Sequence, residues 1–114
     1  MKQIILLVFI SGCGGTLDLI ESDEFASTVS DIWCHRLKEC DRAYYDDSFD
    51  DRQECLSSEA VVWQETHDYY LDRDCQYAPE SGATLYNLFV EMTCGEFYEG
   101  TFTDDFDDIW SCGG

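Results

Sequence analysis

The chain has little positive charge. Its 114 residues include only 6 Lys and Arg against 25 Asp and Glu, which gives a formal net charge of −19 at pH 7. Binding to nucleic acid depends on Lys and Arg side chains that displace the counterions of the phosphate backbone, so the sequence excludes nucleic acid as a partner. Because 45% of the residues are hydrophobic and 15% are aromatic, the chain is nevertheless expected to fold and not to remain disordered.

The motifs of several catalytic and metal-binding families are missing. The sequence contains no Cys-x-x-Cys pair, no Gly-x-Ser-x-Gly, no phosphate-binding loop and no zinc-protease motif. A Cys-His nucleophile pair would need a free thiolate, and Cys34 beside His35 is needed to complete an even set of disulfide cysteines. His67 is expected to be a hydrogen-bonded core or boundary residue. We therefore predict no enzyme, no catalytic residue and no cofactor.

The chain also lacks the run of about 20 apolar residues that a membrane-spanning helix needs. Its longest apolar stretch, residues 4–10, follows Lys2 and precedes the small residues Ser11 and Gly12. A charged start, an apolar segment and small residues before a cleavage site are typical of a secretory signal peptide. The residue after the expected cleavage site is Cys13.

The sequence Ile10-Ser11-Gly12-Cys13 resembles the lipobox of bacterial lipoproteins, in which an aliphatic residue, a small residue, Gly and Cys follow one another. The resemblance implies that residues 1–12 are a lipoprotein signal peptide and that acylated Cys13 anchors the mature chain in a lipid bilayer. It implies a location in the bacterial cell envelope, at the outer membrane or the cell surface. The alternative interpretation makes the apolar stretch a buried strand of a cytosolic protein and Cys13 an ordinary thiol.

Cysteines indicate how the rest of the chain is stabilised. With Cys13 assigned to lipid, an even number remains, which in a short exported chain indicates a disulfide framework. A structural zinc site is the less favoured alternative, because an oxidising compartment promotes disulfides over thiolate ligands. The six predicted disulfide cysteines are Cys34, Cys40, Cys55, Cys75, Cys94 and Cys112.

Apolar residues recur at three- and four-residue steps, which predicts helices. We expect Ser22 or Asp23 to cap the first helix, Ser48 to cap the second, residues 44–47 to interrupt the helical pattern, and Gly95 to end the third helix. The predicted helices cover about residues 23–41, 49–72 and 79–94, with a short fourth helix within 103–110. The stripe expected to face inward in the second helix comprises Leu56, Ala60, Trp63, His67, Tyr70 and Leu71.

The predicted fold class is all-α, a small disulfide-bonded three-helix bundle with a short fourth helix at the C-terminus. Residues 13–22 are expected to form a flexible tether and residues 23–114 a disulfide-stapled helical domain. Packing the helices up, down and up brings Cys40 opposite Cys55 across the first hairpin. This topology then predicts the pairs Cys40–Cys55, Cys34–Cys94 and Cys75–Cys112.

The order of these cysteines also resembles that of small six-cysteine helical lipoproteins of unknown function. The similarity lies in the Cys-x5-Cys spacing of Cys34 and Cys40 and in the connection Cys75-x-Tyr77-x-Pro79. It implies the fold class and the surface location, and it implies no activity.

Two acidic clusters are candidate metal ligands. An EF-hand loop that began at Asp46 would need Gly at position 6 and Glu at position 12, where this chain has Asp51 and Ser57. We therefore predict no metal site and interpret both clusters as charge at the beginnings of helices. The clusters are Asp46, Asp47, Asp50 and Asp51, and Asp104, Asp105, Asp107 and Asp108.

Two function classes remain. The first is a lipid-anchored envelope lipoprotein that acts as a binding or structural interaction module, with a basic protein as its partner. The many Tyr and Trp residues favour this class, because both are enriched at protein contacts. The alternative is a divalent-metal-binding (calcium) envelope protein or a small envelope enzyme.

Overall fold

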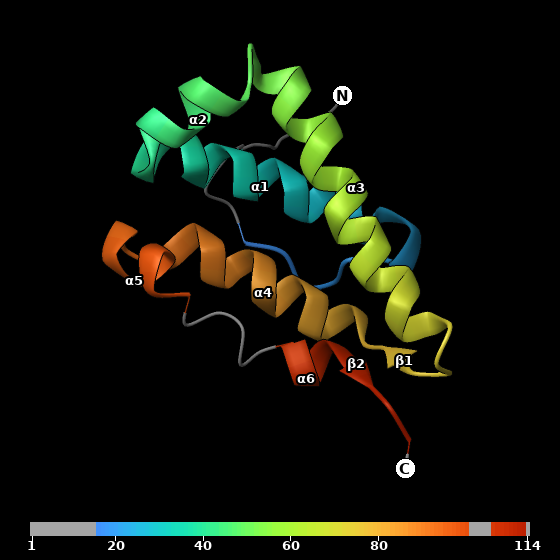
Figure 1. Cartoon of the computed structure of the whole chain (residues 1–114). Helices are drawn as coiled ribbons and strands as arrows, with labels where there is room; N and C mark the ends of the chain where they lie inside the picture. The colour runs from blue at the N-terminus through green and yellow to red at the C-terminus, as the bar shows by residue number, and fades with distance from the viewer. Residues whose placement is uncertain (1–15, 101–105, 114) are drawn as a thin grey trace, which may run out of the picture.

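Three long helices make up most of the structure, a computed structural model that describes residues 16–100 and 106–113. Helix α1 lies in the middle and contacts both α3 and α4 (Figure 1). This arrangement confirms the predicted all-α, disulfide-bonded fold. In chain order the elements are the 3-10 helix η2 (Ser22–Glu24), α1 (Phe25–Cys40), α2 (Arg42–Ser48), α3 (Arg52–Leu71), β1 (Gln76–Tyr77), α4 (Pro79–Glu91), α5 (Cys94–Glu99), α6 (Phe106–Ile109) and β2 (Trp110–Ser111).

Aromatic rings fill the core between the long helices. Phe25 at the start of α1 is fully buried and meets the rings of Trp63 and Trp110 edge to face, at centroid distances of 6.1 and 5.3 Å. Phe89 of α4 meets Trp63 in the same way at 6.3 Å. Edge-to-face pairs add to the free energy of burial, because the positive edge of one ring faces the negative face of another. Leu71, predicted to face inward, is instead exposed.

Helix α2 occupies residues that we expected to interrupt the helical pattern. Tyr45 is buried and packs against Phe49, with ring centroids 5.7 Å apart. On the outer side, Arg42 Nε lies 3.1 Å from Asp46 Oδ1 in an ion pair one helical turn apart. The contact between Tyr45 and Phe49 stabilises this short helix. The apolar pattern of the sequence is interrupted here, so it does not predict α2.

Side-chain caps explain where α3 and α5 begin. Asp51 accepts a hydrogen bond from the backbone N–H of Glu54 at 2.9 Å, so α3 begins after Asp51 and not after the predicted cap Ser48. Thr93 and Glu96 form a reciprocal capping box at the start of α5. That box places Gly95 inside α5, so the prediction that Gly95 ends the third helix is wrong.

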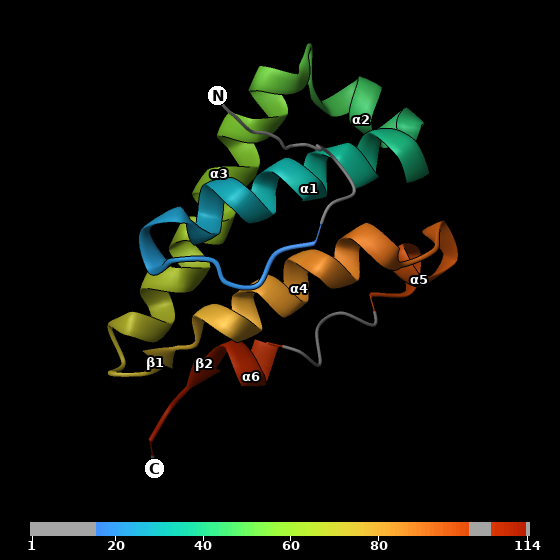
Figure 2. The same cartoon turned by 180° about the vertical axis from the view of Figure 1, so that it is seen from behind.

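Part of the expected tether is folded onto the helices. Ile20 is 3% exposed, and its backbone N–H donates to the Pro79 carbonyl at 3.1 Å. The side-chain amide of Asn87 bonds to both the N–H and the carbonyl of Leu17, at 2.9 and 2.8 Å. Figure 2 shows this segment running beside α4. The prediction of a flexible tether over residues 13–22 is therefore wrong for residues 17–20, and residues 13–15 lie outside the described residues.

A short antiparallel pair of strands closes the other end of the fold. Gln76 pairs with Ser111 and Tyr77 with Trp110, which brings the C-terminal segment beside the connection between α3 and α4. These two-residue strands are a small exception to the predicted all-α class. Among the helices of residues 16–100 and 106–113, each is too short or too polar to span a bilayer.

All six predicted cysteines form disulfides, but two of the three predicted pairs are wrong. The bonds are Cys34–Cys55, Cys40–Cys94 and Cys75–Cys112, so only the last of the predicted pairs is confirmed. The error arises from the first connection. The 7 residues of α2 separate the end of α1 from the start of α3, so Cys40 and Cys55 do not face each other across a tight hairpin.

The disulfide Cys34–Cys55 is buried between α1 and α3, and its loss should destabilise the fold. Replacing both cysteines by Ala should lower the free energy of unfolding by about 3 kcal/mol, because the unfolded chain regains the freedom of a closed loop. Urea titration measures this change. Peptide mapping without reduction should recover the three bonds of the structure, and a peptide joining Cys40 to Cys55 would contradict them.

Candidate functional site

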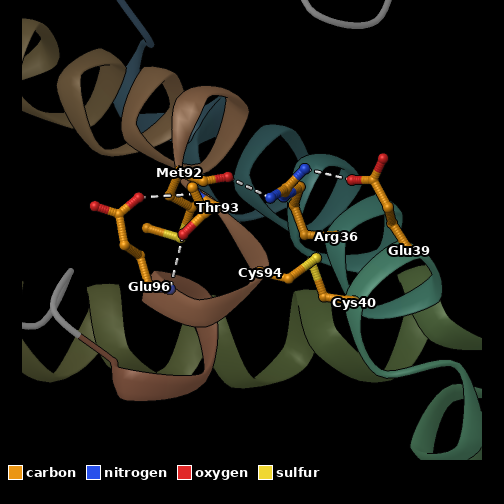
Figure 3. A network of polar contacts seen from close by, with 7 residues as sticks. All are labelled: Arg36, Glu39, Cys40, Met92, Thr93, Cys94 and Glu96. Carbon is orange, nitrogen blue, oxygen red and sulfur yellow. Dashed lines mark hydrogen bonds and ion pairs between the residues drawn. A yellow bond between two sulfur atoms is a disulfide. The ribbon is translucent and has the colours of Figure 1, made fainter.

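A buried arginine joins α1 to the junction of α4 and α5 (Figure 3). Arg36 is 9% exposed, and its Nη2 donates to the carbonyl of Met92, the residue that ends α4. Its Nη1 donates to the carboxylate of Glu39. Two of its nitrogens are thus used inside the molecule, and the guanidinium acts as a structural clamp that satisfies a buried carbonyl.

The same junction is also held by a covalent bond. Cys40, one turn after Arg36 on α1, is bonded to Cys94 at the first position of α5. The Tyr98 hydroxyl of α5 donates to the Cys40 carbonyl. Figure 3 shows this disulfide beside Arg36 and the capping box of α5. The end of α1 is therefore held to the junction of α4 and α5 both by the hydrogen bond from Arg36 to Met92 and by the disulfide Cys40–Cys94.

A second buried polar group lies at the opposite end of the bundle. His67 of α3 is 2% exposed and uses both ring nitrogens. Its Nδ1 accepts from Trp110 Nε1 at 2.9 Å, and its Nε2 lies 2.7 Å from the Ser22 hydroxyl. The indole N–H can only donate, so Nδ1 carries no proton and Nε2 donates to Ser22. Ser22, which we expected to cap a helix, instead joins the N-terminal segment to α3.

Burial determines the proton affinity of this group. Desolvation lowers the pKa of His67 below its usual value of 6.5, and the nearby charge of Asp68 only partly opposes that shift. Tyr77 packs edge to face on the imidazole at 4.9 Å, and burial raises the pKa of this phenol. Neutral His67 is the form that accepts from Trp110. The prediction of a hydrogen-bonded core histidine is thus confirmed.

The other predicted site residues are dispersed. His35 is half-buried on α1, and its neighbour Cys34 is in a disulfide and has no thiol. Cys13 lies outside the described residues. A shallow hollow of about 310 Å³ lies between α1 and α3, but Ser30 in its lining already donates its hydroxyl to the Ala26 carbonyl at 2.6 Å.

Three residues of the first acidic cluster contact residues of their own or the adjacent helix. Asp46 pairs with Arg42, Asp51 caps α3, and the backbone N–H of Asp50 donates to Glu54. Asp51 and the preceding Asp50 lie at a helix beginning as expected, whereas Asp46 and its neighbour Asp47 lie in the second half of α2. Asp108 is exposed. Asp104, Asp105 and the side chain of Asp107 lie outside the described residues. Within the part of the chain that is described, no three His, Cys, Asp or Glu residues are grouped to hold a metal ion.

Sequence reasoning missed one surface, the outward side of α3. Val61 and Val62 are 56% and 54% exposed, and Tyr69 is exposed two turns further along the helix. A helical projection at 100° per residue would have revealed them, because they lie opposite the buried residues Trp63 and His67. We define the α3 outer face as Glu54, Ser58, Val61, Val62, Glu65, Asp68, Tyr69 and Asp72.

No protein-family model, curated protein or solved structure matches this chain.

Removing the clamp at Arg36 should weaken the junction of α1 with α4. Arg36→Ala should lower the free energy of unfolding by about 2 kcal/mol, because it removes charge-assisted hydrogen bonds and leaves the Met92 carbonyl buried without its partner. Lys38→Ala, at an exposed position on the same helix, is the matched control and should change it by less than about 0.5 kcal/mol. Equal losses in urea titrations of the two variants would refute the clamp.

The lowered pKa of His67 predicts that its contribution to stability depends on pH. In the unfolded chain His67 binds a proton near pH 6.5, whereas in the folded chain it does so only at lower pH. The contribution is complete above pH 6.5 and is lost as the pH falls toward the folded pKa, by at most about 1.4 kcal/mol per pH unit. The stability of wild type relative to His67→Gln should therefore decrease between pH 7.5 and 5. Parallel pH profiles for the two chains would contradict this.

Proposed function

We propose that the protein is a lipid-anchored lipoprotein of the bacterial cell envelope, located at the outer membrane or the cell surface, and that it acts as a binding module without enzymatic activity. The observation that carries the proposal is the use of cysteine. The three disulfides use all six other cysteines, which leaves Cys13 of the lipobox-like sequence with no cysteine in the chain to pair with.

The disulfides support export as well. Stable disulfides form in oxidising compartments and are rare in the cytosol. A chain of this size has a modest core, and three disulfides, two of them between helices, fit a domain that must persist outside the cytosol. The apolar segment at residues 4–10 gives the chain an export signal that agrees with this chemistry.

The folded body would lie close to its anchor. Leu17 is bonded to Asn87 of α4, and the four peptide units from Cys13 to Leu17 can span at most about 14 Å. At such a distance the acidic body and an anionic bilayer surface repel each other. The body would therefore project away from the bilayer and present its acidic, aromatic surface to a basic protein partner.

The anchor is tested by expressing the full chain in a bacterium with labelled palmitate. Wild type should incorporate label, lose residues 1–12 and stay in the membrane fraction at high salt, because several acyl chains bury far more apolar surface than a single chain. Cys13→Ser should lose both label and membrane retention. Ser11→Ala keeps a small residue in the lipobox-like sequence and should behave as wild type. An intact mass showing unmodified Cys13 would overturn the proposal.

A further inference from the structure

The α3 outer face combines exposed apolar side chains with carboxylates that form none of the ion pairs among the described residues. Helix α3 has 20 residues, about 30 Å in length, and all eight residues of this face are exposed. Of the seven large hydrophobic side chains exposed in the described residues, Val61, Val62 and Tyr69 lie here. The face is continuous, since its residues fall within about a third of the helix circumference at 100° per residue.

Helix stability does not explain the two valines. Val is a weaker helix former than Ala, because its branched side chain loses rotamers against the preceding turn. Val61 and Val62 are more than half exposed, so burial in the core does not compensate for this loss. The buried side of α3 is formed by other residues, among them Cys55, Trp63 and His67.

The charge of this face is of one sign. Its carboxylates are Glu54, Glu65, Asp68 and Asp72, and the face contains no Lys or Arg. None of the three ion pairs among the described residues involves them. Four carboxylates around an apolar centre are complementary to a partner that carries cations around apolar side chains.

A cation already lies at the edge of this face. The guanidinium carbon of Arg73 is 3.5 Å from the centroid of the Tyr69 ring, and Arg73 Nη1 donates to the Tyr69 carbonyl at 2.9 Å. The contact shows that the Tyr69 ring attracts a positive group, which here is Arg73 of the same chain. This cation–ring contact is independent of the carboxylates, and it is a second reason to expect that this face binds cations.

We infer that the α3 outer face binds a cationic amphipathic helix whose apolar stripe covers Val61 and Val62 and whose Lys and Arg residues meet the flanking carboxylates. The inference rests on the proposed function, because it names the surface and the partner class of that binding module. The α3 outer face is about 30 Å long and can pack against a partner helix, because the side-chain ridges of one helix fit into the grooves of another. A second copy of the chain is disfavoured, because it would place the same four carboxylates against these four.

The test uses the full chain carrying Cys13→Ser, so that no lipid competes, and a synthetic 18-residue Leu-Lys amphipathic helix as the probe. Isothermal titration should show saturable binding that weakens with added salt, because the attraction is partly between exposed charges. Val61→Ser combined with Val62→Ser should weaken binding tenfold or more. Leu19→Ser, at a residue of similar exposure outside α3, should leave it unchanged.

The charges are tested separately. Glu65→Gln with Asp72→Asn should weaken binding and reduce its salt dependence, whereas Glu91→Gln with Glu99→Gln changes the net charge equally away from α3 and should have little effect. Circular dichroism and intact disulfides verify that each variant is folded.

Unchanged binding in the valine variant, or equal losses in the α3 and control variants, would overturn the inference. Self-association of wild type through the valines in sedimentation would also overturn it, because the occupant would then be a second copy. These results leave the anchor unaffected. Failure of the proposed function would be seen in the palmitate-labelling experiment, as wild type that takes up no label and is released from membranes.

Discussion

The fold depends on the attachment of the other helices to α1. Cys34 bonds this helix to α3, and Cys40 bonds it to α5. Arg36, between them on the same helix, donates to the carbonyl that ends α4. A small domain has a limited core, and its stability is a small difference between large opposing terms, so attachments of this kind decide whether it stays folded. Helices α3, α4 and α5, which pack on α1, are thus each attached to it by a disulfide or by a hydrogen bond from the buried Arg36.

The far end of the bundle relies on polar contacts of another kind. His67 connects Ser22 of the N-terminal segment with Trp110 of the C-terminal strand, and Phe25 stacks on its ring at 5.4 Å. The disulfide Cys75–Cys112 closes the same region. Both ends of the described chain are thereby joined to α3. The outward side of α3 takes no part in these contacts and remains available to a partner.

Local patterns could predict the three long helices, whereas most contacts between distant residues, the pair Cys75–Cys112 apart, could not be predicted. The apolar steps from Phe25 to Leu37 and the proline at Pro79 place α1 and α4 well, since both signals act within a few residues. The pairing of Cys34 with Cys55 depends on how far α2 separates α1 from α3, which no local spacing records. The docking of Leu17 on Asn87 spans 70 residues and likewise left no local signal. Val61 and Val62 lie outside the inward stripe of α3, so that stripe gives no indication of them.

The connectivity of the disulfides has a consequence for how the chain is oxidised. Numbered along the body, the cysteines pair first with third, second with fifth, and fourth with sixth, so no bond joins neighbours in sequence. A chain that is oxidised in the order in which its cysteines emerge during synthesis first joins Cys34 to Cys40 and Cys55 to Cys75. Both bonds must then be exchanged by thiolate attack before the native set can form. Oxidation in that order would therefore need thiol–disulfide exchange as well as bond formation to reach the native set.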